Sequence, residues 1–378
     1  MGESNLNLSN KASLIAPRVI SLGQIIVDLT MKVNSVPKPG EDIFASSCNM
    51  RAGASYNMLF AASQMGANAQ WAGVLGEGYF ANIISEALQE AHISHIGTKN
   101  SMLDSGFCVA LTDKSAERTF ISTKGAETSG GECAFDVINP KSEDIVHMSG
   151  YTFVSPMKHA LLRFMLRTSS SSDVMDFRGS KHSRGSNDSK NSFYCCKHRF
   201  TAIFDASPMV ANIVDEDLKA LIDYAPIWVC NAREAEILAK KLNAWNDDEY
   251  NEGVVEESID CKSGICETNN QLTNHKIEHL QRALQAPLVV HTGSDGAWVC
   301  DVGKEAEHTK GFQVKAVDAN GAGDAHTGVL AACIGYEMTL KQAVLCANAA
   351  AALAVTKYGP ATCPTKKEIE DFIKTNVY

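Results

Sequence analysis

A glycine-rich stretch, VDANGAGDAHTGVLAA at residues 317–332, places an ionisable side chain where the pattern predicts the start of a helix. The N–H groups of Gly321, Ala322 and Gly323 can approach a ligand closely, and the first turn of a helix attracts anions. Asp324 at that point cannot attract phosphate, so it fits a base that takes a proton from an attacking hydroxyl. The alternative is an aspartate that caps an ordinary helix, and this stretch alone leaves both interpretations open.

Other nucleotide and catalytic motifs are missing from the sequence. No GxxxxGK[ST] occurs, which excludes the P-loop class, and the first predicted strand is not followed by GxGxxG, which argues against a dinucleotide-binding unit. No HExxH or GxSxG occurs either, so a zinc protease and an α/β-hydrolase are disfavoured.

Composition limits the classes of partner. The chain has 378 residues, of which 45% are hydrophobic and 21% charged, and its net charge of −10 argues against a nucleic-acid binder. No apolar run is long enough to predict a membrane-spanning helix, and the N-terminus does not resemble a signal peptide. The 12 cysteines are scattered, mostly singly in apolar runs. That pattern is typical of reduced thiols, so we expect a cytoplasmic protein.

The elements that must position the glycine stretch follow an alternating pattern. Buried strands such as residues 18–29 alternate with helices, which predicts a mainly parallel sheet covered on both faces. Two hairpin-like regions, near 30–50 and 105–123, interrupt the alternation and are expected to form a small second sheet. We expect a flexible N-terminus at residues 1–17 and a single domain over 18–378.

Two polar stretches look like insertions. Residues 169–199 are rich in serine and lack periodicity, which predicts a disordered surface loop. Cys195, Cys196 and His198 lie within it, but no second ligand pair has suitable spacing, so a metal site is disfavoured. The polar, acidic segment 244–274 contains Cys261 and Cys266, which are expected to be free thiols.

The glycine stretch also resembles the C-terminal signature of the PfkB family, the ribokinase-like carbohydrate and nucleoside kinases. Further motifs of the family are matched in the same order over roughly 300 residues; they are SLGQIIVDLTMKVNSVPKPGE, RAGASYNMLFAASQMGA, CNAREAE, VVHTGSDGAW and ANAAAALAVTKYGPATCP. The resemblance implies a ribokinase-like three-layer α/β/α sandwich with a mainly parallel central sheet and a small β-sheet lid. It also implies transfer of the γ-phosphoryl group of ATP to a hydroxymethyl group of a small sugar.

The resemblance assigns roles on the nucleotide side of the site. Asp324 is implied as the general base, and the N–H groups of the GAGD loop as the anion hole. The other implied ligands are Asn231 and Glu234 for Mg²⁺ through water, Thr292, Gly293, Gly296 and Asn348 for the nucleotide, and Asp318 with carbonyls near Tyr358 and Gly359 for a monovalent cation such as K⁺. Helix capping is the alternative for Asn231 and Glu234.

The resemblance also assigns the substrate side. Asp28, Gly53 and Asn57 are implied to bind the hydroxyls of a small-molecule sugar or nucleoside, although Asp28 alone would be read as a turn residue at the end of a strand. Neither nucleic acid nor membrane is an expected partner, and a homodimer through the lid is a further hypothesis.

Several positions depart from the family pattern. Ala52 stands in place of the first of two glycines, Ala319 in place of threonine, and His326 in place of phenylalanine. Cys363 occupies a position where serine or threonine is frequent, which bears on dependence on potassium. None of these changes affects Asp324 or the glycines beside it, so an active enzyme is expected.

Two rival functions follow from the same motifs. A nucleoside kinase would need an apolar slot for the base, which Tyr56, Met58 and Phe107 could supply. A non-catalytic regulator that binds a sugar or nucleotide is the other rival, and the intact GAGD and NxxE motifs argue against it.

Overall fold

The computed structural model describes residues 15–114, 118–169, 198–245 and 272–377. Most of the expected flexible N-terminus, most of the two polar insertions, and the cysteines at 195, 196, 261 and 266 lie outside these ranges. His198 is described: it is buried, its Nδ1 lies 2.6 Å from the carbonyl oxygen of Phe200, and its ring stacks on that of Phe200. Among the described residues, no group of three or more His, Cys, Asp or Glu side chains is arranged to hold a metal ion directly.

The centre of the fold is a large sheet. Within the described residues it has nine strands, in the order β13-β12-β11-β10-β9-β8-β1-β4-β5. Its strands are β1 (Arg18–Ser21), β4 (Asn68–Trp71), β5 (Ser94–His95), β8 (Ile145–Ser149), β9 (Thr201–Asp205), β10 (Ile227–Asn231), β11 (Leu288–His291), β12 (Gly296–Cys300) and β13 (Glu307–Lys310). Pairing is parallel from β11 to β5, and β12 and β13 add an antiparallel hairpin at one edge. The alternating pattern of the sequence therefore predicted the main topology correctly.

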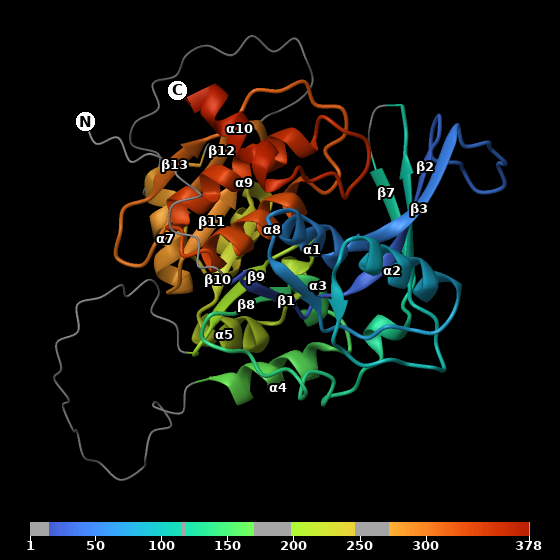
Figure 1. Cartoon of the computed structure of the whole chain (residues 1–378), viewed down its shortest axis with the longest axis horizontal. Helices are drawn as coiled ribbons and strands as arrows, with labels where there is room; N and C mark the ends of the chain where they lie inside the picture. Colours follow the sequence, from blue (N-terminus) through green and yellow to red (C-terminus); the bar gives the residue numbers. More distant parts are fainter. Residues whose placement is uncertain (1–14, 115–117, 170–197, 246–271, 378) are drawn as a thin grey trace.

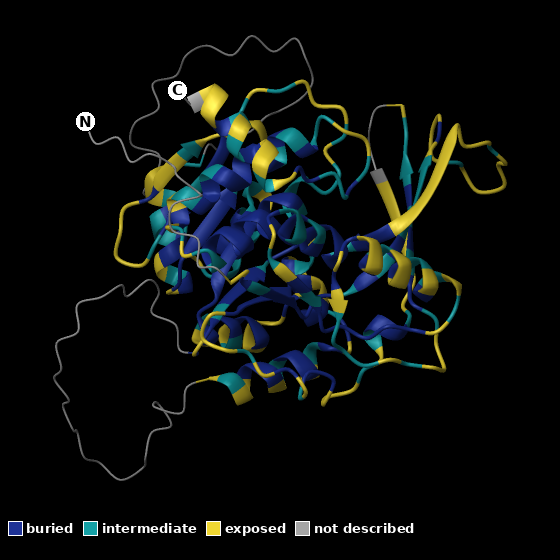
Figure 2. Cartoon of the chain, viewed as in Figure 1, coloured by how far each residue is buried: buried dark blue, intermediate teal, exposed yellow. Residues whose placement is uncertain are grey.

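Helices cover both faces of this sheet, as its buried strands require (Figures 1 and 2). One face packs against α1 (Ser55–Gln64), α2 (Tyr79–Glu90), α8 (Ala322–Gly335), α9 (Leu340–Ala354) and α10 (Lys366–Val377). The other face packs against α3 (Gly150–Phe153), α4 (Lys158–Thr168), α5 (Asp215–Tyr224), α6 (Ala232–Lys241) and α7 (Asn274–Leu284). None of the helices in the described ranges is long and apolar enough to cross a membrane.

A smaller sheet projects from one side of the sandwich (Figure 1). It contains β2 (Ile25–Lys32), β3 (Ser47–Ala54), β6 (Phe107–Thr112) and β7 (Arg118–Ser122), in the order β3-β2-β6-β7. Its hairpins pair antiparallel, and β2 pairs parallel with β6. Strands β3, β6 and β7 come from the two regions that interrupt the alternating pattern. The prediction of one buried strand over residues 18–29 is wrong, because the chain leaves the large sheet after β1 and enters the smaller sheet as β2. We call this sheet the lid.

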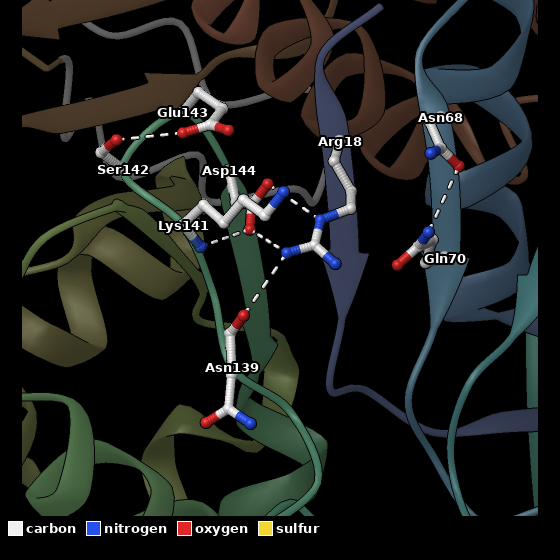
Figure 3. Close-up of polar contacts among 8 residues, drawn as sticks. All are labelled: Arg18, Asn68, Gln70, Asn139, Lys141, Ser142, Glu143 and Asp144. Atoms are coloured by element: carbon white, nitrogen blue, oxygen red, sulfur yellow. Dashed lines mark hydrogen bonds and ion pairs between the residues drawn. The ribbon is translucent and has the colours of Figure 1, made fainter.

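An ion pair anchors the central strands at the edge opposite the functional side chains (Figure 3). Arg18 at the start of β1 donates from Nε to Oδ1 of Asp144 at 2.9 Å, and its Nη2 pairs with Oδ2 of the same carboxylate. The backbone N–H of Lys141 also donates to this Oδ2. Only 2% of the Asp144 side chain is exposed, so the arginine and the N–H group compensate for the loss of water around a buried charge.

Close packing between α1 and α8 brings two distant segments together. A Cβ atom built on Gly328 of α8 would lie 2.2 Å from the carbonyl oxygen of Met58 and 2.7 Å from the Cβ of Ala61, both in α1. Only a residue without a side chain allows this approach. The same pair of helices carries Asn57 and Asp324, so their packing determines the geometry of the site.

We expect Gly328→Ala to destabilise the protein by about 1–3 kcal/mol, because the methyl group meets backbone atoms that cannot move aside. The matched control is Gly323→Ala in the same helix. Its Cβ would lie 3.6 Å from the His291 ring, an ordinary contact, so the usual helical gain from alanine of up to about 1 kcal/mol should remain. Chemical denaturation of both variants measures the difference, and a Gly328→Ala protein as stable as Gly323→Ala would contradict this account of the helix packing.

Candidate functional site

The carboxyl edge of the parallel sheet collects polar side chains from three neighbouring strands. Asp205 ends β9, Asn231 ends β10 and His291 ends β11, and Asn231 pairs directly with His291 in the sheet register. In open α/β sheets this edge is where ligands bind, because the loops that follow the strands leave polar backbone there.

Asp324 lies beside this edge, in the first turn of α8. The N-terminal cap of the helix is Gly321, no side chain caps it, and Asp324 is the third helical residue. The capping interpretation of Asp324 is therefore wrong. Its Oδ2 instead accepts a hydrogen bond of 3.1 Å from Nδ2 of Asn57. Burial raises the pKa of Asp324 from 3.8 to about 6, and the bond from Asn57 partly opposes that rise.

The glycine loop has the conformation that its sequence requires. Gly321 has a φ of 74°, and a Cβ atom there would lie 2.1 Å from the carbonyl oxygen of Pro360. The N–H of Ala322 donates a long hydrogen bond to the carbonyl oxygen of Ala319, with an N–O distance of 3.4 Å. A helix start without a side-chain cap offers its N–H groups to an external acceptor, so the loop fits a phosphate group.

Asp28 and Gly53 come together on the lid. A Cβ atom on Gly53 would lie 2.0 Å from Oδ2 of Asp28, so the glycine makes room for the carboxylate. Burial, and then the charge of Asp324, raise the pKa of Asp28 from 3.8 to about 6. The three predicted substrate residues thus converge with the predicted base, since Asn57 contacts Asp324 directly and Asp28 interacts with it electrostatically.

Asn231 and Glu234 form a capping box at the start of α6. The Asn231 side chain accepts the N–H of Glu234 at 2.9 Å, and Glu234 accepts both the backbone N–H and the Nδ2 of Asn231. The capping alternative is therefore correct as a description of the contacts. Both carboxylate oxygens have partners, so Glu234 is suited to hold a hydrated cation through water and not by direct ligation.

The turn between β11 and β12 is closed and rigid. The Thr292 N–H and hydroxyl both donate to the carbonyl oxygen of Gly296, at 2.8 and 3.1 Å. Gly296 has a φ of 109°, and a Cβ atom there would lie 2.1 Å from the carbonyl oxygen of Thr309. Gly293, with a φ of 66°, has open space around its α-carbon. Gly293 is thus the residue of this turn that leaves room for a ligand.

Asn348 is buried and used within the fold. Its Nδ2 donates to the carbonyls of Thr309 and Lys310, and its Oδ1 lies 3.2 Å from Nε2 of His326. The His326 ring lies 5.6 Å from that of His291, which borders Gly323. Asn348 therefore joins α9 to α8 and β13, and its amide does not point freely into a nucleotide pocket.

Asp318 connects two loops. Its Oδ1 accepts the N–H of Asn320 at 3.0 Å, and its Oδ2 accepts the N–H of Gly359 at 3.1 Å. This pairing holds residues 358–360 against the glycine loop, and a Cβ atom on Gly321 would lie 2.1 Å from the carbonyl oxygen of Pro360.

The comparisons with known proteins agree with this geometry. The pattern of pfkB family carbohydrate kinases matches residues 16–188 and 190–367. The chain belongs to the pfkB family of carbohydrate kinases. Membership makes it a phosphotransferase of the sugar and nucleoside kinase class.

Relatives and solved structures support the assignment over the full length of the family domain. The chain is 25% identical over 353 residues to YegV of Escherichia coli (strain K12), an uncharacterized sugar kinase, covering 93% of this chain and 92% of that protein. It is also 25% identical over 357 residues to the ribokinase of Haemophilus influenzae, covering 93% and 97%. The ribokinase structure from Thermotoga maritima matches with a TM-score of 0.67 at 21% identity, covering 95% of this chain and 100% of that one. The structure is therefore a ribokinase-like α/β/α sandwich with a small lid sheet.

Two residues in the site of this pfkB-family chain escaped the sequence reasoning. Asp205 accepts the N–H of Ser207 and the hydroxyl of Thr327, and burial followed by the charges of Asp324 and Glu234 raises its pKa from 3.8 to about 8. Burial and the same three carboxylates raise the pKa of Tyr151, on α3, to about 12. In the sequence, the predicted strand ending in FDAS was the only feature that could have indicated Asp205, and no feature indicated Tyr151.

The raised pKa of Asp205 predicts a pH-dependent stability. The folded state binds more protons than the unfolded state between about pH 4 and pH 8, so this group makes stability fall as pH rises through that window. Asp205→Asn should therefore stabilise the ligand-free protein, with a gain that grows from about pH 5 to about pH 8 and reaches on the order of 1–3 kcal/mol. Urea unfolding at both pH values measures the gain.

Asp136→Asn is the matched control, because Arg163 holds the pKa of this exposed carboxyl below its usual value. Its replacement should give no stabilisation at pH 8. Equal behaviour of the two variants would contradict the strong burial of charge at Asp205.

Proposed function

We propose that this kinase transfers the γ-phosphoryl group of ATP to a hydroxymethyl group of a small sugar, with Asp324 as the general base. The observation that carries the proposal is the contact between Asn57 and Asp324, which joins the predicted substrate residues to the start of α8. An acceptor held by Asp28 and Asn57 then has its reacting hydroxyl next to the carboxylate of Asp324.

Each of the site residues has a defined role in this mechanism. Asp28 and Asn57 orient the acceptor hydroxyls, and Asp324 accepts the proton from the attacking oxygen. With a pKa of about 6, Asp324 is mostly ionised at neutral pH and is still a stronger base than an ordinary aspartate. The N–H groups of Gly321, Ala322 and Gly323 stabilise negative charge on the transferred group. MgATP, when bound, supplies the phosphoryl group and a cation that neutralises its charge.

The residues around the sheet edge fit such a donor. Asn231 and Glu234 hold Mg²⁺ through water, and Asp205 nearby gains a partner for its otherwise costly charge. Thr292, Gly293 and Gly296 border the nucleotide, and Asn348 supports that wall from behind. Asp318 and the carbonyls near Tyr358 and Gly359 bind a monovalent cation such as K⁺, which orders the glycine loop.

The site favours a sugar over a nucleoside. The residues considered for an aromatic slot are engaged elsewhere: Tyr56 and Met58 are buried in the core, and Phe107 stacks on Phe80 with ring centroids 4.7 Å apart. Val27 and Phe107 are paired in the lid register and point away from the face that carries Asp28. A nucleoside base therefore gains no stacking partner from these three side chains.

We also propose that two copies associate through the lid. Met50, Phe120 and Ile121 of the lid strands are exposed, by 39%, 60% and 61% respectively. Exposed apolar side chains on strands favour burial against another protein surface. Sedimentation of the wild type and of Ile121→Glu tests this, and a wild-type monomer at all accessible concentrations would contradict it.

Asp324→Asn should lower turnover by roughly 10²–10⁴-fold and leave folding and ATP binding nearly intact. Asparagine keeps an oxygen that can accept the bond from Asn57, so only the base is lost. ADP release with a panel of sugars and nucleosides identifies the acceptor and measures turnover. The assignment of the base fails if the variant keeps more than about a tenth of the wild-type rate.

Asp28→Ala should raise the Michaelis constant for the acceptor by about tenfold or more, since a charge-assisted hydrogen bond contributes on the order of 1.5–3 kcal/mol. The Michaelis constant for ATP should change little, because the lid faces the acceptor. Steady-state kinetics with each substrate varied in turn separate the two effects. A change confined to ATP would place Asp28 outside the acceptor site.

A further inference from the structure

The lid face that carries Asp28 also carries two cations. Asp28 of β2 pairs directly with Arg51 of β3 and with Cys108 of β6. Directly paired residues lie on the same face of a sheet, and so do alternate residues along one strand. Arg51 and Lys32 therefore share the face of Asp28, which is the face that interacts with Asp324.

Arg51 does not neutralise its neighbour Asp28. No ion pair joins the two, although their backbones are directly opposed. The guanidinium instead reaches the loop at Gly359, where Nη1 lies 3.2 Å from the position that a Cβ atom would occupy. The next residue of that loop, Pro360, packs on Gly321. Arg51 therefore lies between Asp28, the carboxylate proposed to bind the acceptor, and the loop that supports the anion hole.

Lys32 lies beside the same loop. Its Nζ is 4.4 Å from the centroid of the Tyr358 ring, a cation–π contact that leaves the ammonium group in water. Both Lys32 and Arg51 are exposed, and neither makes an ion pair within the described part of the chain. Two cations without carboxylate partners thus flank residues 358 and 359 on the acceptor side of the site.

A neutral sugar has no charged group for these two cations to bind. Hydroxyl groups are satisfied by Asp28 and Asn57, whereas a planar guanidinium is suited to bind a carboxylate or a phosphate with two parallel hydrogen bonds. Asp205 and Glu234 lie at the sheet edge, whereas Asp28 lies on the lid beside Arg51. The guanidinium reaches toward Gly359, so an anionic group on the acceptor side is attracted there.

We propose that the natural acceptor is an anionic sugar, either a sugar acid or a sugar phosphate, whose charged group binds Arg51. The proposal rests on the sugar kinase function above and specifies its substrate class. Lys32 lies about 13 Å farther along β2 from Asp28, so it attracts the anion at longer range and does not define its position.

The test compares related acceptors with and without an anionic group. Gluconate is paired with glucose, and fructose 6-phosphate with fructose. Binding of each to the full chain is measured by calorimetry without ATP, so the result does not depend on phosphoryl transfer. We expect the anionic member of at least one pair to bind tenfold or more tightly than its neutral partner, and the pair that shows the preference distinguishes carboxylate from phosphate.

Arg51→Gln keeps a polar side chain but shortens it and removes the guanidinium and its charge. It should weaken binding of the preferred anion about 10- to 100-fold and change binding of the neutral partner less than about twofold. Lys32→Gln should weaken binding of the anion by about two- to fivefold. Lys38→Gln, an exposed cation in the loop between β2 and β3, is the matched control and should change neither.

Two results would overturn the proposal. Neutral sugars that bind as tightly as their anionic partners would show that no anion site exists on the lid. An Arg51→Gln enzyme that loses turnover equally with both members of a pair, at unchanged acceptor affinity, would place the guanidinium on the transferred phosphoryl group. Failure of the kinase function itself is seen separately, as no transfer from ATP to any acceptor or as full activity of Asp324→Asn.

Discussion

The burial of one carboxylate at the start of a helix determines most of the site. Within the described residues, the side chain of Asp324 has one hydrogen-bonding side chain as partner, Asn57, and burial opposes its ionisation. This arrangement exists only because α1 and α8 pack with backbone in contact at Gly328. A carboxylate in that position gains basicity from burial but remains ionised at neutral pH, which is what removal of a proton from an alcohol requires.

The sheet edge near Asp324 carries two further carboxylates with raised pKa values, Asp205 and Glu234. The charges of Asp324 and Glu234 both act on Asp205, and burial raises the pKa of each of the three carboxylates. Burial of such a cluster lowers the stability of the ligand-free protein. In the proposed function, a bound cation would supply the missing positive charge.

The lid complements this acidic edge with the opposite charge. The lid face that carries Asp28 also presents Arg51 and Lys32 toward the loop that supports the glycine turn. In the proposed function, Asp28 and Arg51 would bind different parts of the acceptor, and an anionic end would be oriented by Arg51.

The sequence by itself determined the alternation of strands and helices and its interruption near the lid, and it indicated the glycine stretch around Asp324 as a candidate site, because periodicity and glycine spacing are local properties. It also indicated both roles available to Asn231 and Glu234, since a capping box is defined within four residues. Only the tertiary structure showed that Asp205 and Tyr151 interact electrostatically with Asp324, that Asn348 is bound within the fold, and that Arg51 shares the lid face of Asp28 without forming an ion pair with it. These features depend on strand register and helix packing between residues far apart in the chain, where burial and long-range charge set the chemistry of each group.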